Sequence, residues 1–319
     1  MSSLRKLERD FVRADLAAVS SLLGQLTEED AMARFGLEAR RDELQEAIAR
    51  LEEETEEPVA SAALFFGGRP VVGTHGIESE FAGTAVSKFQ DIVSKVMAHE
   101  AGTLGQRGVV PNKSASRLHI TNIVRGSFGF LLEEVPLHKP ASGTALKAAV
   151  DETTRLLDSF GKDDEEAFRT TVEAIDERVL TTAREFFDLM RDQGATLRLV
   201  SGDTDRSFGT DAVARAAERA TSTVVEDSEE TIQGQLAAFL PAAHEFEFKA
   251  VGDRGTMNGK VDRTLTTEQL EQLNRDLIGV GSKARIHTRR VLRSGALVRE
   301  SFTLLSLERS PMRPPNHTN

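Results

Sequence analysis

The chain of 319 residues contains no cysteine, no tryptophan and no tyrosine. The absence of cysteine excludes disulfides, thiolate metal sites and cysteine nucleophiles, and it fits a reducing compartment. Tyrosine and tryptophan commonly provide the surfaces on which single-stranded nucleic acids stack, so their absence disfavours that class of partner. The 17 phenylalanines therefore have to supply the large aromatic side chains of the core.

Long hydrophobic segments are also missing. No run approaches the roughly 20 apolar residues that a membrane-spanning helix needs. Residues 1–16, MSSLRKLERDFVRADL, alternate acidic and basic side chains and lack the apolar segment of a secretory signal. Together with the missing cysteine, this predicts a soluble, cytoplasmic protein that has no membrane partner.

The charge is unevenly distributed along the chain. The net charge is −11. Residues 229–319 carry 13 Lys and Arg against 11 Asp and Glu, whereas residues 1–58 carry 8 against 15. A strongly acidic body disfavours broad contact with nucleic acid or an anionic membrane. Only the C-terminal third offers a locally basic surface.

Residues 1–57 are predicted to form a helical hairpin. Apolar side chains spaced by three and four residues define one face of a first helix over 3–23: Leu4, Leu7, Phe11, Ala14, Ala18 and Leu22. A second helix over 28–54 carries a narrower stripe: Leu37, Leu44, Ile48 and Leu51. A narrow stripe on a highly charged helix favours packing on one neighbour, including a neighbour from another subunit.

Residues 58–223 are predicted to form an α+β domain, an antiparallel sheet with helices. Gly67-Gly68 between two apolar runs, 59–66 and 70–77, predicts a first hairpin. The runs 117–124 and 127–134 predict a second, and 196–200 a further strand. Helices are expected over 80–98, 144–160, 163–193 and 209–219. The third of these would be a rod of about 45 Å.

Residues 224–310 contain strand-like runs at 230–239, 244–250, 256–261, 282–292 and 296–307, with a helical run at 266–277. This order, with Gly234 midway along the first strand, resembles that of a small OB-type barrel. The resemblance rests on element order alone. It implies a binding module and does not say what is bound. The Pro-rich tail, 311–319, is predicted to be disordered.

The sequence contains no complete catalytic motif, and no catalytic residue is predicted. The most enzyme-like segment holds Asp203, Asp205 and Asp211 after the strand 196–200. A polar loop between a strand and a helix often binds ligands in α/β proteins, and paired carboxylates can hold Mg²⁺ or Mn²⁺. Such residues more often form Asx turns and helix caps. A metal-dependent phosphoryl hydrolase at this loop is one hypothesis, and no other cofactor is expected.

The strongest binding candidate is the fourth barrel strand. Lys283, Arg285, His287 and Arg289 alternate with apolar or small residues, so they share one face, and Arg290 and Arg293 follow. Such a basic stripe suits a phosphate group or an acidic protein surface. The competing interpretation is a solvated outer face whose charges pair across strands, for instance with Glu245 and Glu247.

The sequence therefore favours a non-catalytic binding or assembly protein. Its N-terminal hairpin and long helix would drive self-association into a homo-oligomer, and its barrel would engage a protein partner. The alternatives are the hydrolase at Asp203 and Asp205 and a nucleic-acid module that uses strand 282–292. The acidic body disfavours the nucleic-acid module.

Overall fold

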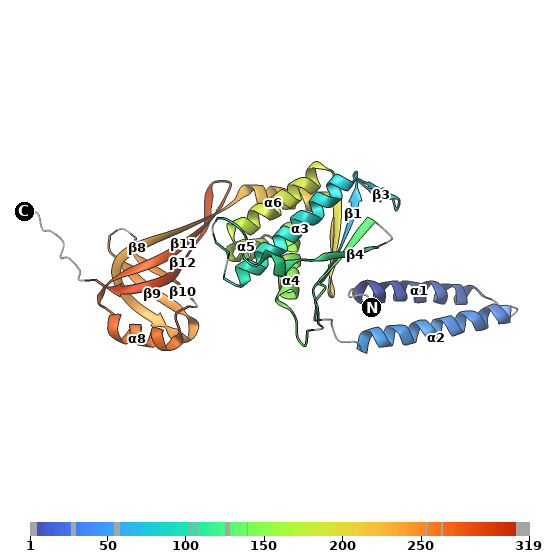
Figure 1. The fold of residues 1–319 in the computed structure, drawn as a ribbon, viewed down its shortest axis with the longest axis horizontal. Coiled ribbons are helices and arrows are strands. Elements are labelled where there is room, and N and C mark those ends of the chain that lie inside the picture. Colours follow the sequence, from blue (N-terminus) through green and yellow to red (C-terminus); the bar gives the residue numbers. More distant parts are fainter. Residues whose placement is uncertain are drawn as a thin grey trace, which may run out of the picture. The chain divides into compact units, whose positions relative to one another are not determined.

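The computed structural model describes residues 5–26, 30–53, 58–102, 104–105, 107–124, 128–138, 140–252, 254–262 and 264–310. Leu4, the predicted turn at 125–126 and the predicted disordered tail 311–319 lie outside these ranges. The chain divides into two compact units, Met1–Thr221 and Ser222–Asn319, and has the predicted mixed α+β character (Figure 1). Within the described ranges, no helix combines the length and apolar character that crossing a membrane requires.

The first unit begins with the predicted helical hairpin, α1 (Arg5–Gln25) and α2 (Ala31–Glu53). The two helices pack on each other and are linked by ion pairs between Arg13 and Glu52, at 2.7 Å, and between Arg40 and Asp15, at 2.8 Å. Val19 of α1 and Leu44 of α2 are the buried hydrophobic side chains of the pair. The stripe predicted for α2 contains this Leu44.

The packing face of α1 differs from the prediction. Apart from Leu7, which packs against the sheet, its least exposed apolar side chains are Val12, Leu16, Val19 and Leu23. The predicted stripe lies about a third of a turn away, and its middle and end are exposed: Phe11, Ala14, Ala18 and Leu22. Helix α1 thus has two apolar faces, and the second helix of the hairpin covers only one of them.

A five-stranded antiparallel sheet forms the centre of the first unit, in the order β4-β5-β1-β6-β7. Its strands are β1 (Ser61–Gly68), β4 (His119–Val124), β5 (Phe128–Glu133), β6 (Ala195–Ser201) and β7 (Thr204–Phe208). Side chains alternate between its two faces. Phe66 of β1 packs edge-on against Phe81 of helix α3 (Ser79–Glu100). On the opposite face, Ala63 and Phe65 form a small cluster against which Leu7 of α1 packs.

The first predicted hairpin is wrong. Strand β1 pairs with β5 and β6, whereas β2 (Val71–Val72) pairs only with β3 (Gly76–Ile77). Gly67 and Gly68 are the last two residues of β1, where they pair with Thr196 and Ala195 of β6. The close approach of the two strands leaves no room for a side chain at Gly68. Gly68 has φ +83°, and a Cβ there would lie 2.2 Å from the Gly194 carbonyl oxygen. The second predicted hairpin is confirmed as β4 and β5.

The predicted long rod is also wrong, because it is two helices. Helix α5 (Glu165–Ala174) ends before Ile175, whose backbone is extended, and α6 (Glu177–Asp192) then begins. The side chain of Asp176 accepts a hydrogen bond from the Arg178 backbone N–H at 2.7 Å, a helix N-cap. The remaining helices of this unit, α4 (Ala145–Gly161) and α7 (Thr210–Ser222), lie where the sequence places them.

The second unit is a closed five-stranded barrel with strand order β10-β12-β11-β8-β9. Its elements follow the predicted order: β8 (Thr223–Leu240), β9 (Glu245–Ala250), β10 (Thr256–Val261), α8 (Thr267–Leu277), β11 (Gly281–Arg293) and β12 (Ala296–Arg309). A short parallel pairing of β10 with β12 closes the barrel. At fold level the predicted OB-like barrel is confirmed.

Gly234 lies where β8 pairs with both of its neighbours, opposite Ala250 of β9 and Ser282 of β11. A Cβ at this position would lie 2.1 Å from the Lys249 carbonyl oxygen, so a side chain here would clash with β9. The glycine that marked the strand in the sequence thus allows β9 to approach β8 closely at a residue that also pairs with β11.

Strand β8 is longer than predicted. Beyond the closed barrel, residues 223–228 of β8, 288–293 of β11 and 296–302 of β12 form a three-stranded extension. We call this segment the ribbon (Figure 1). Within the described residues, β9 and β10 pair with other parts of these strands, so the ribbon is an open sheet.

Candidate binding sites

Along β11, outward-facing basic side chains alternate with buried side chains, as predicted. Ser282, Ala284, Ile286 and Thr288 are buried, whereas Lys283 and Arg285 are exposed. Arg290 differs from the others because its position continues the alternation of the buried set, although Arg290 itself is exposed. The stripe proper therefore consists of Lys283, Arg285, His287 and Arg289.

Half of this stripe converges on one carboxylate, Asp227 of β8. Arg289 donates two hydrogen bonds to it, from Nε to Oδ1 at 3.0 Å and from Nη2 to Oδ2 at 3.1 Å. The Nε2 atom of His287 lies 3.1 Å from Oδ1. Only 12% of the Asp227 side chain is exposed. Burial acts to raise the pKa of Asp227, but the hydrogen bonds and charges of His287 and Arg289 outweigh it and lower the pKa to about 2.

The other basic residues are engaged to different degrees. Arg290 Nε lies 2.7 Å from Glu300 of β12, and Arg285 Nε lies 3.9 Å from Glu229 of β8. Lys283 has no carboxylate within ion-pair distance among the described residues. Arg293 lies at the end of the ribbon, where it pairs with Thr223 in the strand register.

The carboxylates that pair with the basic residues of β11 belong to β8 and β12. The cross-strand partners expected from β9, Glu245 and Glu247, are therefore wrong. Strand β9 is not a neighbour of β11, and its Glu245 pairs with Lys260 at 2.5 Å. The unit Ser222–Asn319 has 13 basic and 13 acidic residues. Glu226 and Asp227, which precede the predicted strand, bring its charge into balance.

A small polar cavity of about 220 Å³ lies over the barrel core. Met257 and Phe302 line its base, and two ion pairs surround it. Glu230 accepts from Arg254 at 2.8 Å, and Arg290 pairs with Glu300. The hydrogen bond from Arg254 lowers the pKa of Glu230. With two arginines and two glutamates, this cavity favours neither a cation nor an anion.

The aspartates of the hydrolase hypothesis are not assembled into a common site. The segment expected to be a polar loop is a tight turn followed by β7, since Gly202 adopts a positive φ of 53°. Asp203 is 70% exposed and pairs with Arg9 at 3.1 Å. Asp211 lies in the first turn of α7. Within the described ranges, no three histidine, aspartate or glutamate side chains are grouped so that they could hold a metal ion.

Asp205 is already held by two cations. Arg198 donates two hydrogen bonds to it, at 3.0 and 2.8 Å, and Lys6 of α1 lies 3.4 Å away. The hydrogen bond from Arg198 lowers the pKa of Asp205. Because α1 supplies Lys6 and Arg9, these aspartates help to attach the hairpin to the sheet.

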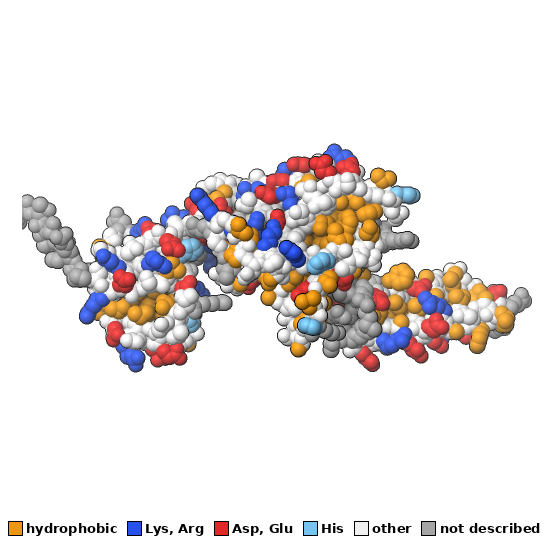
Figure 2. Space-filling model, viewed as in Figure 1, with side chains coloured by type: hydrophobic (Ala, Val, Ile, Leu, Met, Phe, Trp, Pro, Cys, Tyr) orange, Lys and Arg blue, Asp and Glu red, His pale blue; other side chains and the backbone are white. Residues whose placement is uncertain are grey.

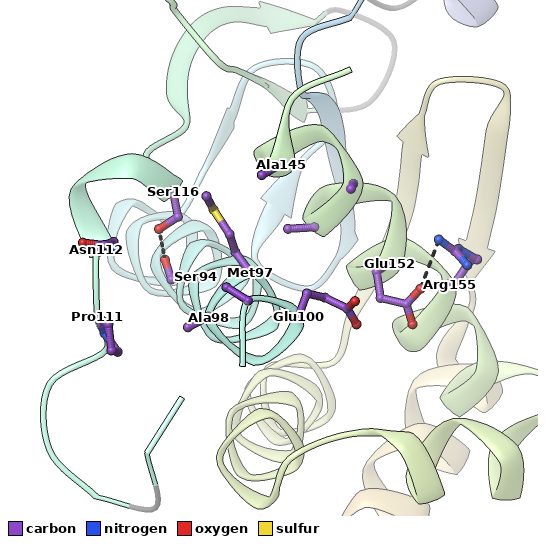
Figure 3. Close-up of a pocket in the computed structure, with 13 residues that line it drawn as sticks. Ser94, Met97, Ala98, Glu100, Pro111, Asn112, Ser116, Ala145, Glu152 and Arg155 are labelled. Carbon is purple, nitrogen blue, oxygen red and sulfur yellow. Dashed lines mark hydrogen bonds and ion pairs between the residues drawn. The ribbon is translucent and has the colours of Figure 1, made fainter. Parts of the chain in front are cut away.

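Sequence reasoning missed a pocket between α3 and α4. It has a volume of about 340 Å³, within the range of small-molecule sites. Small side chains form most of its walls: Ala98, Ala101, Ala145, Ala148 and Ala149, with Pro111. Ser94, Ser116 and Met97 also line it, and Glu100, Glu152 and Arg155 occupy one end (Figure 3). The spacing of alanines on α4 by three and four residues was the signal available in the sequence.

The hydroxyls of this pocket belong to a buried network. Ser94 and Ser116 are each 2% exposed, and Ser116 Oγ donates to Ser94 Oγ at 2.7 Å. Ser94 Oγ in turn donates to the Gln90 carbonyl oxygen at 2.8 Å. The Gln90 side chain also bonds to the backbone of Ser116 and Leu118, at 2.6 and 2.8 Å. The network fixes the short helix Lys113–Ser116 against α3.

No protein-family model matches the chain, and neither curated proteins nor solved structures match it.

Proposed function

We propose that the chain is a non-catalytic binding and assembly protein that forms homo-oligomers through the α1–α2 hairpin and engages a protein partner through the barrel. One observation supports self-association above all. The hairpin exposes large apolar side chains: Phe11 at 73%, Leu22 at 50%, Met32 at 90% and Phe35 at 75%. Figure 2 shows hydrophobic side chains on the visible surface of this hairpin.

The interior of a two-helix hairpin is too small to bury these side chains. Two helices bury one seam between them, and an amphipathic helix with a second apolar face needs another neighbour. Two copies of a hairpin can provide that neighbour by forming a four-helix bundle. Helices α5 and α6 bury Phe168, Phe186 and Phe187 inside their own unit. The proposal therefore rests on the hairpin and no longer includes a long helix.

Sedimentation velocity across a broad range of concentrations tests this proposal on the full chain. The variant Phe11→Glu with Phe35→Glu should weaken association at least about a hundredfold, because each buried phenylalanine contributes about 1.5–3 kcal/mol. Ser20→Glu with Gln45→Glu is the matched control, since both residues are exposed and polar on the same helices. A wild-type chain that sediments as a monomer at every concentration would refute self-association.

For the barrel, the ribbon is the part that supports a protein partner. It exposes Val224, Leu297 and Val298 at 45%, 56% and 45%. Val224 and Leu297 both pair with Leu292, which puts them on the face of the sheet opposite to the basic stripe. An open sheet that carries exposed apolar residues and few unpaired charges suits a protein surface better than a nucleic acid. This proposal includes a cytoplasmic location, which fits the absence of cysteine, and requires no cofactor.

Fluorescence anisotropy with labelled DNA and RNA oligonucleotides separates the two partner classes. We expect no binding that depends steeply on salt, because the charges of the barrel are balanced. Tight binding that weakens with salt and disappears in Lys283→Glu with Arg285→Glu would support the nucleic-acid module instead. Leu297→Ser with Val298→Ser serves as the control, since it changes the ribbon without changing its charge.

A further inference from the structure

The pocket between α3 and α4 presents hydrogen-bond acceptors and carboxylates at the edge of an apolar cavity. We propose that this pocket binds a small organic cation, an ammonium group on a compact apolar body. The inference is independent of self-association and of the barrel, because every residue that lines the pocket belongs to the α+β part of the first unit.

The walls define the apolar part of the ligand. Alanines on two packed helices leave open space where larger side chains would have filled the gap between them. Met97 extends into this space, and its flexible thioether adapts to ligands of different shape (Figure 3). A volume of about 340 Å³ accommodates a single ring with a short chain.

The polar groups define the charged part. Figure 3 shows the Glu100 and Glu152 carboxylates at the same end of the pocket. Glu152 has a partner in Arg155 at 3.0 Å, whereas no cation of the described chain lies within ion-pair distance of Glu100. Two carboxylates with one arginine leave a net negative charge, which favours a ligand cation over a neutral or anionic ligand.

The hydroxyls reinforce this preference. Ser116 Oγ donates its proton within the network, and no donor among the described residues bonds to its lone pairs. Because Ser116 lines the pocket, its hydroxyl is available there as an acceptor. Ser94 Oγ accepts from Ser116 and from Gln90 Nε2, at 3.2 Å, so its acceptor capacity is filled. A second N–H or O–H donor on the ligand finds its partner at Ser116.

Methyl-¹³C methionine NMR on the full chain tests the proposal, because Met97 is one of 6 methionines and lines the pocket. Met97→Leu assigns its signal. The probes are 2-phenylethylammonium, 2-phenylethanol and 3-phenylpropionate. We expect the ammonium to shift the Met97 signal with a Kd of about 1 mM or tighter. The neutral alcohol should bind at least about tenfold more weakly, and the carboxylate should not bind.

Two kinds of variant separate charge from shape. Glu100→Gln with Glu152→Gln should remove the preference for the ammonium over the alcohol. Ala148→Leu, at an exposed position of the wall, should prevent both probes from shifting Met97. Glu80→Gln, at the opposite end of α3, is the control and should behave as the wild type.

Three results would overturn the proposal. They are a Met97 signal that no amine shifts, equal affinity for the ammonium and the alcohol, and an ammonium preference that survives in the double glutamine variant. Circular dichroism confirms that each variant is folded. The two kinds of variant change different residues, so a folding defect in one leaves the other decisive.

Discussion

In the α1–α2 hairpin most of the predicted apolar stripe of α1 lies exposed, whereas in the barrel half of the predicted basic stripe of β11 is held by a carboxylate of the neighbouring strand. The difference follows from the number of neighbours. A helix in a two-helix hairpin has one, so a second apolar face stays open. A strand inside a sheet has two, so its outward side chains meet partners on both sides. A conspicuous residue pattern thus indicates a binding surface only where the fold leaves it without a neighbour.

The largest effect should come from Asp227, which holds the stripe in its neutralised state. Asp227→Ala leaves Arg289 and His287 without their carboxylate in a site that is mostly buried. We expect a loss of about 2–3 kcal/mol in the stability of the barrel. Hydrogen exchange of β8 and β11, followed by mass spectrometry, measures it within this unit.

Glu229→Ala is the matched control on the same strand. Its contact with Arg285 spans 3.9 Å, and both side chains are more than half exposed, at 52% and 57%. Such a pair contributes less than about 0.5 kcal/mol. If the two variants proved equally stable, Asp227 would not organise the stripe, and the proposed contrast with the hairpin would fail.

Acid should reproduce part of the same effect. The pKa of Asp227 lies at about 2 in the folded barrel, below its ordinary value of 3.8. A depressed folded-state pKa stabilises the protein above the unfolded-state pKa, and this stabilisation is lost as the pH falls through the window from about 4 to 2. We expect a loss of about 1–2 kcal/mol, allowing for solvent screening.

The comparison that checks the pH dependence is the variant Asp227→Asn. It lacks the titrating carboxylate, so the exchange-derived stability of its barrel should change less between pH 4 and pH 2 than that of the wild type. An identical slope in both proteins would assign the acid sensitivity to other carboxylates.

How far the sequence predicts each region depends on the range of the interactions. The order of the barrel elements was readable because alternation and turns are local, and Gly234 marked the strand that is shared. The partner of Arg289 could not be predicted, because Asp227 is 62 positions away and precedes the run that was predicted to be a strand. The same limit hid the break at Asp176, where a cap interrupted a continuous apolar stripe.

The pocket and the hairpin also depend on contacts between segments that are far apart in the sequence. Ser94, Ser116 and Glu152 come from three separate segments, and the packing of α4 and of the short helix Lys113–Ser116 on α3 brings them together. In α1 both apolar faces were present in the sequence, but periodicity does not say which of them meets α2. That choice depends on the side chains of both helices and on Leu7, which packs against the sheet.

The smallest effect should be that of Phe11→Ser on a dilute, monomeric chain. Phe11 is 73% exposed, so its replacement should change the stability of the hairpin by less than about 0.5 kcal/mol. Val19→Ser, at a position that is 6% exposed on the adjacent face, should cost about 1–3 kcal/mol, because it puts a hydroxyl into the seam. Hydrogen exchange of α1 at low concentration compares the two. A larger loss from Phe11→Ser would show that Phe11 packs within one copy, and the exposed stripe would then no longer distinguish the hairpin from the barrel.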